Sequence, residues 1–316
     1  MSGPLFYYLC FTAIFLLASW ALYLPYRMGQ LHFLTVANMV ISAYFGAILS
    51  GATAVSSATA VATASAQTAA PGLHWPFFAV LLAATALSAL IGFLVSLAIG
   101  DAPCFSVVIV GFTFMYLFKT IAENTAALGK TLGMFNVPRI IDSNQGNRIF
   151  LTVIIYALTA LTLFFIRRFD QSSLGRSATL IFADRDLAVS VGVDIKKTGM
   201  ILQTASSALG GLAGTLYLYV TRSISPLFIT FRNLGLFMTI LFVGGYTTPW
   251  GALLAAPILW GLPLILPEAM QPWKNVFYAL ALILVILLKP EGIITRPVLR
   301  RIALGIKTLF GAKDER

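Results

Sequence analysis

The chain has 316 residues, of which 59% are hydrophobic and 10% are charged, and its formal net charge is +10. Soluble domains carry roughly 25% charged residues and could not bury this much apolar surface, so the composition excludes an ordinary soluble protein. The basic residues stand between apolar runs or near the C-terminus, without a basic domain interleaved with aromatic residues, which argues against a nucleic-acid partner.

Apolar runs long enough to cross a bilayer recur along the chain, and a helix needs about 20 predominantly apolar residues to do so. We expect about nine membrane-spanning helices, with roughly eight to ten as the range, in an all-α polytopic bundle that forms one domain over residues 1–316. They are predicted at 5–24, 31–50, 75–99, 101–118, 149–166, 200–221, 234–247, 249–268 and 273–289. Residues 51–70, rich in Ala, Ser and Thr, are interpreted as a possible buried or re-entrant additional segment.

Lysine and arginine residues concentrate in the loop 167–199 and in the tail 290–316. Because basic residues accumulate in cytoplasmic loops, both segments, and with them the C-terminus, are predicted to lie in the cytoplasm. An even number of predicted spans separates them, so the two assignments agree. Counting spans backward places 119–148 and the N-terminus outside, although the segment 119–148 itself carries several basic residues.

Residues 183–189 in the loop 167–199 have the pattern of a short amphipathic helix. Asp184 would complement the helix dipole at its start, and Gly192 is a natural stop. Two interpretations remain open for this helix. It either docks onto a partner protein or closes the loop as a solvated surface helix.

Glycines gather where helices are expected to pack closely. They are Gly210, Gly211 and Gly214 within one predicted span, and Gly244, Gly245 and Gly251 around a predicted helix reversal. Small residues about one turn apart let helix backbones approach each other, and this is the leading interpretation for all six. A gate or hinge is the alternative for both groups, and the place of the second group at a helix reversal favours a hinge beside the cytoplasmic gate.

The middle of each predicted span lacks ionisable residues, which argues against a carrier driven by protons or sodium ions. The polar groups best placed to meet a solute are Thr35, Asn38, Ser42 and Thr113, with hydrogen bonds between helices as the alternative. Gly129-Lys130-Thr131 imitates the end of a P-loop, but the first glycine of that motif is missing. The sequence therefore predicts no nucleotide site, no catalytic residues and no metal site, and the protein is not expected to be an enzyme.

Several longer motifs occur in a fixed order: SLGRSATLIFADRDLAVSVGVD, ASSALGGLAGTLY, VGGYTTPWGALLAAPIL and LLKPEGI. In order and spacing they resemble the permease subunits of bacterial branched-chain amino acid ABC importers, a family that includes urea and short-chain amide permeases. The N-terminal half agrees more loosely. Where that family usually has Gly-His after Gly29-Gln30-Leu31, this chain has Val36-Ala37 or nearby residues, so the solute is left open.

The resemblance implies a translocation subunit of the bacterial inner membrane that works with other proteins. These are a second homologous permease subunit, two ATPase subunits that hold ATP and Mg²⁺, and a periplasmic or lipid-anchored solute-binding protein, while the chain itself holds no cofactor. The short helix would be the coupling helix that docks on the ATPase, through Asp184, Arg185, Asp186, Leu187, Ala188, Val191 and Gly192.

A branched-chain or other hydrophobic amino acid is the leading solute for such a permease, with urea, a short amide or another small organic solute as the alternative. Two other classes remain open. One is an ATP-independent carrier or facilitator, and the other is a structural or receptor-like membrane subunit.

Overall fold

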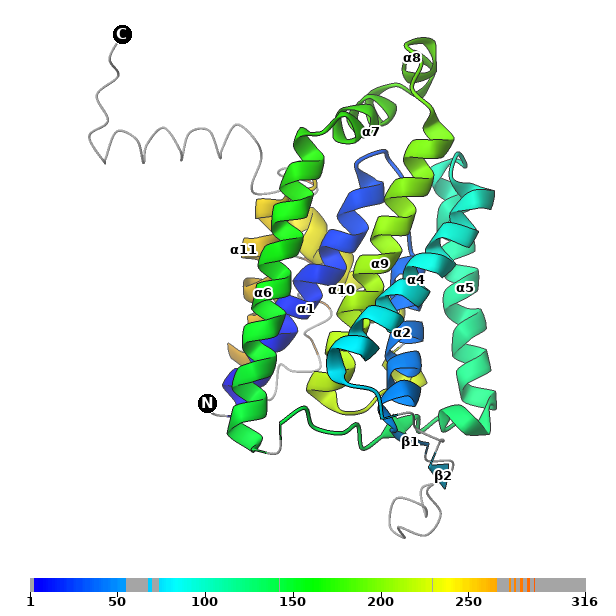
Figure 1. Ribbon diagram of the computed structural model, residues 1–316. Coiled ribbons are helices and arrows are strands. Elements are labelled where there is room, and N and C mark those ends of the chain that lie inside the picture. Colours follow the sequence, from blue (N-terminus) through cyan, green and yellow to red (C-terminus); the bar gives the residue numbers. More distant parts are fainter. Residues whose placement is uncertain are drawn as a thin grey trace, which may run out of the picture.

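The computed structural model describes residues 3–54, 68–69, 74–141, 143–228 and 230–265, together with isolated residues between 273 and 287. These residues form a bundle of long helices with a small sheet at one end (Figure 1). The tail 290–316, the predicted span 273–289 in most of its residues, and most of the segment 51–70 lie outside the described residues.

The predicted spans from 5–24 to 249–268 each coincide with a helix, so the all-α fold class is confirmed. The long helices are α1 Gly3–Tyr26, α2 Leu34–Ser50, α4 Phe77–Ile99, α5 Cys104–Asn124, α6 Asn144–Gln171, α9 Ile195–Thr221, α10 Phe231–Gly244 and α11 Pro249–Ile265. Between them lie α7 Ser173–Ala183, α8 Arg185–Ser190 and the short 3-10 helices η2 Ala126–Leu128 and η3 Pro226–Phe228.

Four described helices, α1, α4, α5 and α6, are long and apolar enough to cross a membrane, and α2 and α10 are shorter apolar helices. The start of α5 differs from the predicted span 101–118. Pro103 has an extended backbone, with φ −63° and ψ 157°, and occupies the N-cap position, so the helix begins at Cys104. The helix then continues to Asn124, past an ion pair between Lys119 and Glu123 one turn apart.

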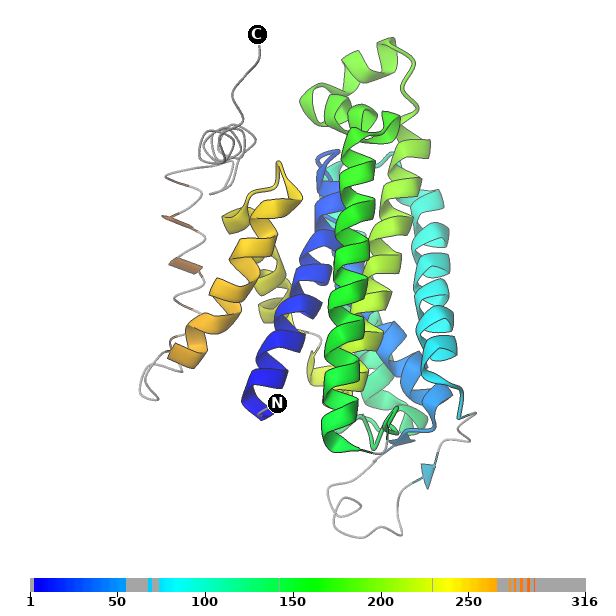
Figure 2. The ribbon, with the colours of Figure 1, turned by 60° about the vertical axis from the view of Figure 1, so that its left-hand side comes forward.

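The helix α9 packs against α4, α2 and α1, and α1 also packs against α6, α10 and α11. In Figure 2 the helices α10 and α11 lie on one side of α1, with α9 and α4 on the other. Several large side chains on the outer helices are exposed, among them Phe105, Phe164 and Phe165. An apolar outer face of this kind suits lipid or another subunit as its neighbour.

The strands β1 Thr53–Ala54, β2 Thr68–Ala69 and β3 Met134–Phe135 form a small antiparallel sheet in the order β2-β1-β3. Thr53 pairs with Ala69, and the Trp75 amide donates to the Leu49 carbonyl at 3.1 Å. The two ends of segment 51–70 therefore meet at the same end of the bundle. The described part of this segment gives no support to an additional crossing.

The helices α7 and α8 stand at the end of the bundle opposite to the sheet (Figure 1). We call these two ends the α8 end and the sheet end. Because α6 runs from one end to the other, residues on either side of it must lie on opposite faces of a membrane. The positive-inside bias predicts that the α8 end is cytoplasmic.

Single cysteines at Ser173 and Gln145, both exposed, test this topology. The background should carry Cys104→Ser, because Cys104 is half-buried whereas Cys10 is buried. A membrane-impermeant maleimide is expected to label Ser173→Cys only from the cytoplasmic side and Gln145→Cys only from the other side. Labelling of both from one side would contradict a crossing by α6, and the reversed pattern would contradict the orientation.

Candidate functional site

The short helix expected at the α8 end is present as α8, and its two ends have the predicted chemistry. The Asp184 carboxylate accepts hydrogen bonds from the backbone N–H groups of Asp186 and Leu187, at 2.9 and 3.0 Å. It thus satisfies donors that the first turn of a helix leaves unpaired. Gly192 follows with a φ of +82°, a conformation in which glycine is favoured because it lacks a Cβ.

The apolar side chains of α8 and of Val191, which directly follows it, divide into an exposed and a buried set. Leu187, Val189 and Val191 are 50%, 58% and 62% exposed, whereas Ala188 is 0% exposed. The prediction that Ala188 reaches a partner is therefore wrong, because its methyl group faces the loop's own interior. Val189, which the sequence analysis did not single out, is also exposed.

Arg185 also differs in part from the prediction. Its guanidinium donates to the backbone carbonyl of Asp101, in the turn between α4 and α5. The side chain remains exposed, but one of its contacts is made within the chain. Arg185 therefore attaches α8 to the ends of two long helices.

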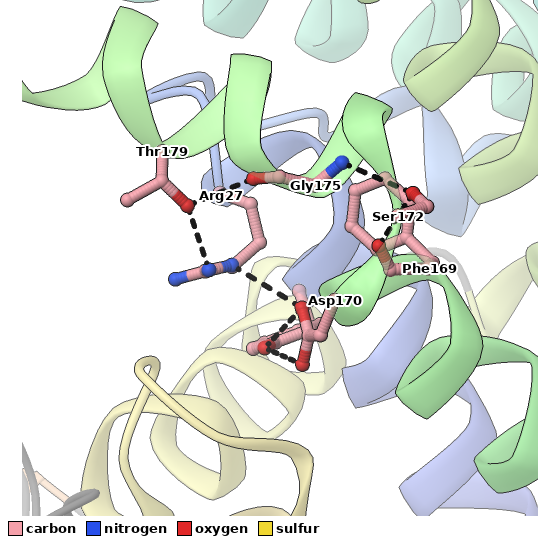
Figure 3. Close-up of polar contacts among 7 residues, drawn as sticks. Arg27, Phe169, Asp170, Ser172, Gly175 and Thr179 are labelled. Carbon is pink, nitrogen blue, oxygen red and sulfur yellow. Dashed lines mark hydrogen bonds and ion pairs between the residues drawn. The ribbon is translucent and has the colours of Figure 1, made fainter.

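A buried ion pair joins the end of α6, just before α7, to the end of α1 (Figure 3). The Arg27 Nε atom lies 3.5 Å from Asp170 Oδ1, and the two side chains are 9% and 15% exposed. The Tyr23 hydroxyl donates to the same carboxylate, at 2.8 Å to Oδ2. Arg27 Nη2 also donates to the Thr179 hydroxyl at 2.8 Å. Between these two partners, Ser172 caps the start of α7 by accepting from the Gly175 amide.

An aromatic cluster lies beside the ion pair. The Tyr26 ring is 6.0 Å from that of Phe182 at the end of α7, and 5.1 Å from that of Tyr246 in the turn between α10 and α11. Phe182 and Tyr246 also contact each other, at 6.0 Å. Such ring contacts add to the stability gained by burial alone. The end of α1 is therefore in contact with both α7 and the α10–α11 turn.

A second buried polar cluster, at the α8 end, joins the α1–α2 connection, the α4–α5 turn and α9. Gln30 Nε2 donates to the Ala102 carbonyl at 2.7 Å, and Gln203 Nε2 donates to Gln30 Oε1 at 2.7 Å. Both glutamines are almost fully buried. They hold the α1–α2 connection and the α4–α5 turn against α9.

The predicted glycines lie at close backbone contacts. A Cβ at Gly210 would stand 2.7 Å from the Thr35 carbonyl oxygen, and one at Gly214 would overlap the Met39 carbonyl oxygen. At Gly211 it would overlap the Ser88 side chain. These contacts favour close packing as the role of this group.

The glycines of the second group meet across the reversal between α10 and α11. A Cβ at Gly244 would overlap the Gly251 backbone, and one at Gly251 would overlap that of Gly244. Gly245 has a φ of +117°, a conformation that other residues rarely adopt. Close packing is therefore present here too, and a hinge at this turn stays a prediction.

The four candidate pathway residues are not brought together. Thr35, Asn38 and Ser42 are at most 1% exposed on α2. The Thr35 and Ser206 hydroxyls are 2.8 Å apart, between α2 and α9. Thr113 is exposed on α5 and donates to the Ile109 carbonyl of its own helix. Among the described residues, the Ser42 hydroxyl donates to the Met39 carbonyl of its own helix, and the Asn38 side chain has no hydrogen-bond partner. Hydrogen bonding between helices is therefore present for Thr35 alone, and contact of Asn38 or Ser42 with a solute stays a prediction.

Comparison with known proteins gives one family and two curated relatives. The family model for the permease component of the branched-chain amino acid transport system matches residues 5–287. The high-affinity branched-chain amino acid transport system permease protein LivM of Escherichia coli K12, and that of Salmonella typhimurium LT2, are each 29% identical over 157 residues. These matches cover 48% of this chain and 36% of each relative, so the chain matches about a third of their length. No solved structure matches significantly.

The glycine contacts of α9 can be tested by comparing two Gly→Ala changes. Gly214→Ala places a methyl group against a backbone carbonyl that no side-chain rotation can move, and should destabilise the protein by about 1–3 kcal/mol. Gly235→Ala in α10 is the control, since a Cβ there would meet no described atom within 4 Å. Thermal unfolding in detergent should show a lower Tm for the first and an unchanged or higher Tm for the second. Equal Tm values for both would contradict the close approach of α9 and α2.

Proposed function

The chain belongs to the family of branched-chain amino acid transport permease components, and from that membership we propose that it is the translocation subunit of an ATP-driven importer. The proposal assigns ATP and Mg²⁺ to two separate ATPase subunits. It assigns the other half of the pathway to a second, homologous permease, and solute delivery to a periplasmic or lipid-anchored binding protein. The chain would lie in the bacterial inner membrane with its C-terminus in the cytoplasm.

The observation that carries the proposal is the form of α8. It is a capped helix at one end of a membrane bundle, with Leu187 and Val189 exposed on it and Val191 exposed directly after its end. Two exposed apolar side chains on a helix of six residues, with a third directly after its end, are costly in water. Leu187 and Val191 are four residues apart and so lie on one side of α8, where they are suited to an apolar groove on another protein. Asp186, also exposed, is available for a charged partner.

The location of α8 also supports a role in energy coupling. A partner that closes around ATP would pull on α8 and so move the helices to which α8 is attached. Those attachments are the Arg185 contact to the α4–α5 turn and the continuous chain through α7 into α6. Energy would then come from outside the chain, as the lack of ionisable residues in the middle of the predicted spans suggests.

A branched-chain or other hydrophobic amino acid is the proposed solute. Its support is the printed function of the two relatives, at 29% identity over about half of this chain. Urea or a short amide is the alternative. Its support is that this chain has Val36-Ala37 or nearby residues where the similar permeases usually have Gly-His. Uptake of leucine, isoleucine, valine and urea by the reconstituted complex would distinguish these solutes.

Replacing Asp186 by Lys and Leu187 by Glu tests α8 as the docking helix. Both residues are exposed and lie outside the long helices, so the subunit should still insert and fold. A charge that faces an apolar groove costs several kcal/mol, and each 1.4 kcal/mol lowers an association constant about tenfold. The ATPase subunits should therefore no longer co-purify, and uptake should fall about tenfold or more at a normal level of this subunit.

The matched control carries Gln145→Lys and Ile141→Glu, which place the same charges on exposed residues at the sheet end. This control should keep the ATPase subunits bound. Normal co-purification and uptake by the α8 variant would show that α8 is only a solvated surface helix.

A further inference from the structure

We propose that Arg27 transmits the movement of α7 and α8 to α1, acting as a positioning residue between the docking helix and the membrane bundle. The inference rests on the proposed function. It adds the contact through which the movement of an ATPase subunit would reach α1. It is carried by the geometry around the bend between α6 and α7 (Figure 3).

Arg27 contacts both sides of that bend. Its Nε atom faces Asp170, the penultimate residue of α6, at 3.5 Å, and its Nη2 atom donates to Thr179 on α7 at 2.8 Å. The chain leaves helical geometry at Ser172 between the two, with φ −78° and ψ 171°. A rotation of α7 about this bend would therefore have to move the guanidinium or break one of its two contacts.

Arg27 is itself rigidly attached to α1. Its backbone N–H donates to the carbonyls of Tyr23 and Leu24, at 3.1 and 3.2 Å, so it continues the last turn of that helix. The Tyr23 hydroxyl, one turn earlier, binds the same Asp170 carboxylate. A displacement of the guanidinium is thus passed to the end of α1 rather than absorbed by a flexible segment.

Stability alone gives a weak account of this ion pair. Burying two charges costs desolvation, so a buried pair is seldom more stable than apolar packing of the same volume. What such a pair does supply is a single relative position of the elements that it joins. The Lys119–Glu123 pair at the sheet end is different, because it is 3.9 Å long, more exposed and lies within one helix.

The sharpest test removes the α7 contact of Arg27 and leaves its contact with Asp170 in place. Thr179→Val deletes the hydroxyl that accepts from Arg27 and that donates to the Gly175 carbonyl one turn earlier in α7. The position is exposed and the backbone bonds of α7 are unchanged, so the fold should persist. In proteoliposomes with the ATPase and binding-protein subunits, ATP hydrolysis should stay within about twofold of the wild type. The number of solute molecules moved per ATP should fall about tenfold, a typical size for the coupling between two sites. Thr179→Ser keeps the hydroxyl and should restore the wild-type ratio.

A second variant addresses the other contact. Asp170→Asn keeps the shape of the side chain but removes its charge, and should lower the same ratio about tenfold. Glu123→Gln is the matched control, since it removes the carboxylate charge from the ion pair at the sheet end. It should leave the number of solute molecules moved per ATP unchanged. The solute is whichever of leucine, isoleucine, valine and urea the wild-type complex accumulates.

The outcomes separate this inference from the proposed function. A wild-type complex that accumulates none of these solutes with ATP would overturn the proposed function itself. Accumulation by the wild type together with an unchanged ratio in Thr179→Val would overturn only the role of Arg27. An equal loss in Thr179→Val and Thr179→Ser would also overturn it, because the hydroxyl would then not be the group that matters.

Discussion

The close approach of α9 to α2 and α4 is the constraint on which the rest of the bundle depends. Apolar side chains gain little by leaving lipid for one another, so helices in a bilayer are held by close contact and by hydrogen bonds between them. Gly214 against the Met39 carbonyl and Gly211 against Ser88 give α9 that contact on two sides. With α9 fixed in this way, α1 can pack along it, and α1 in turn carries α6, α10 and α11.

The α8 end adds a layer of polar and aromatic contacts to this apolar bundle. The loop that bears α8 is attached to α1 by Arg27, to the α10–α11 turn by the ring of Phe182, and to the α4–α5 turn by Arg185. For the buried Arg27 guanidinium one arrangement is favoured, because a broken contact leaves an unpaired group in an environment of low dielectric constant. The region can therefore shift as a unit, which is the property that coupling to another subunit requires.

Much of this architecture could be predicted from sequence, because long apolar runs and helix caps are local signals. Asp184 and Gly192 marked α8 correctly for that reason. Which residues of a helix are buried and which are exposed was not predictable. Lipid and the protein interior are both apolar, so no periodic pattern in the sequence separates buried Thr35 from exposed Thr113. The Arg27 contacts were also missed. A charged residue beside a membrane span indicates the orientation of that span. The pairing of Arg27 with Asp170, more than a hundred positions away, leaves no local pattern in the sequence.

The central claim is that α8 is the surface through which ATP-driven motion enters this chain. A photo-crosslinking amino acid at Val189, which is 58% exposed, tests it most directly in the membranes that hold the assembled transporter. The account predicts a covalent adduct between this subunit and an ATPase subunit, and none from the same probe at Gln145 at the sheet end. An ATPase adduct from another position of the loop, such as Lys197, without one from Val189 would contradict the account.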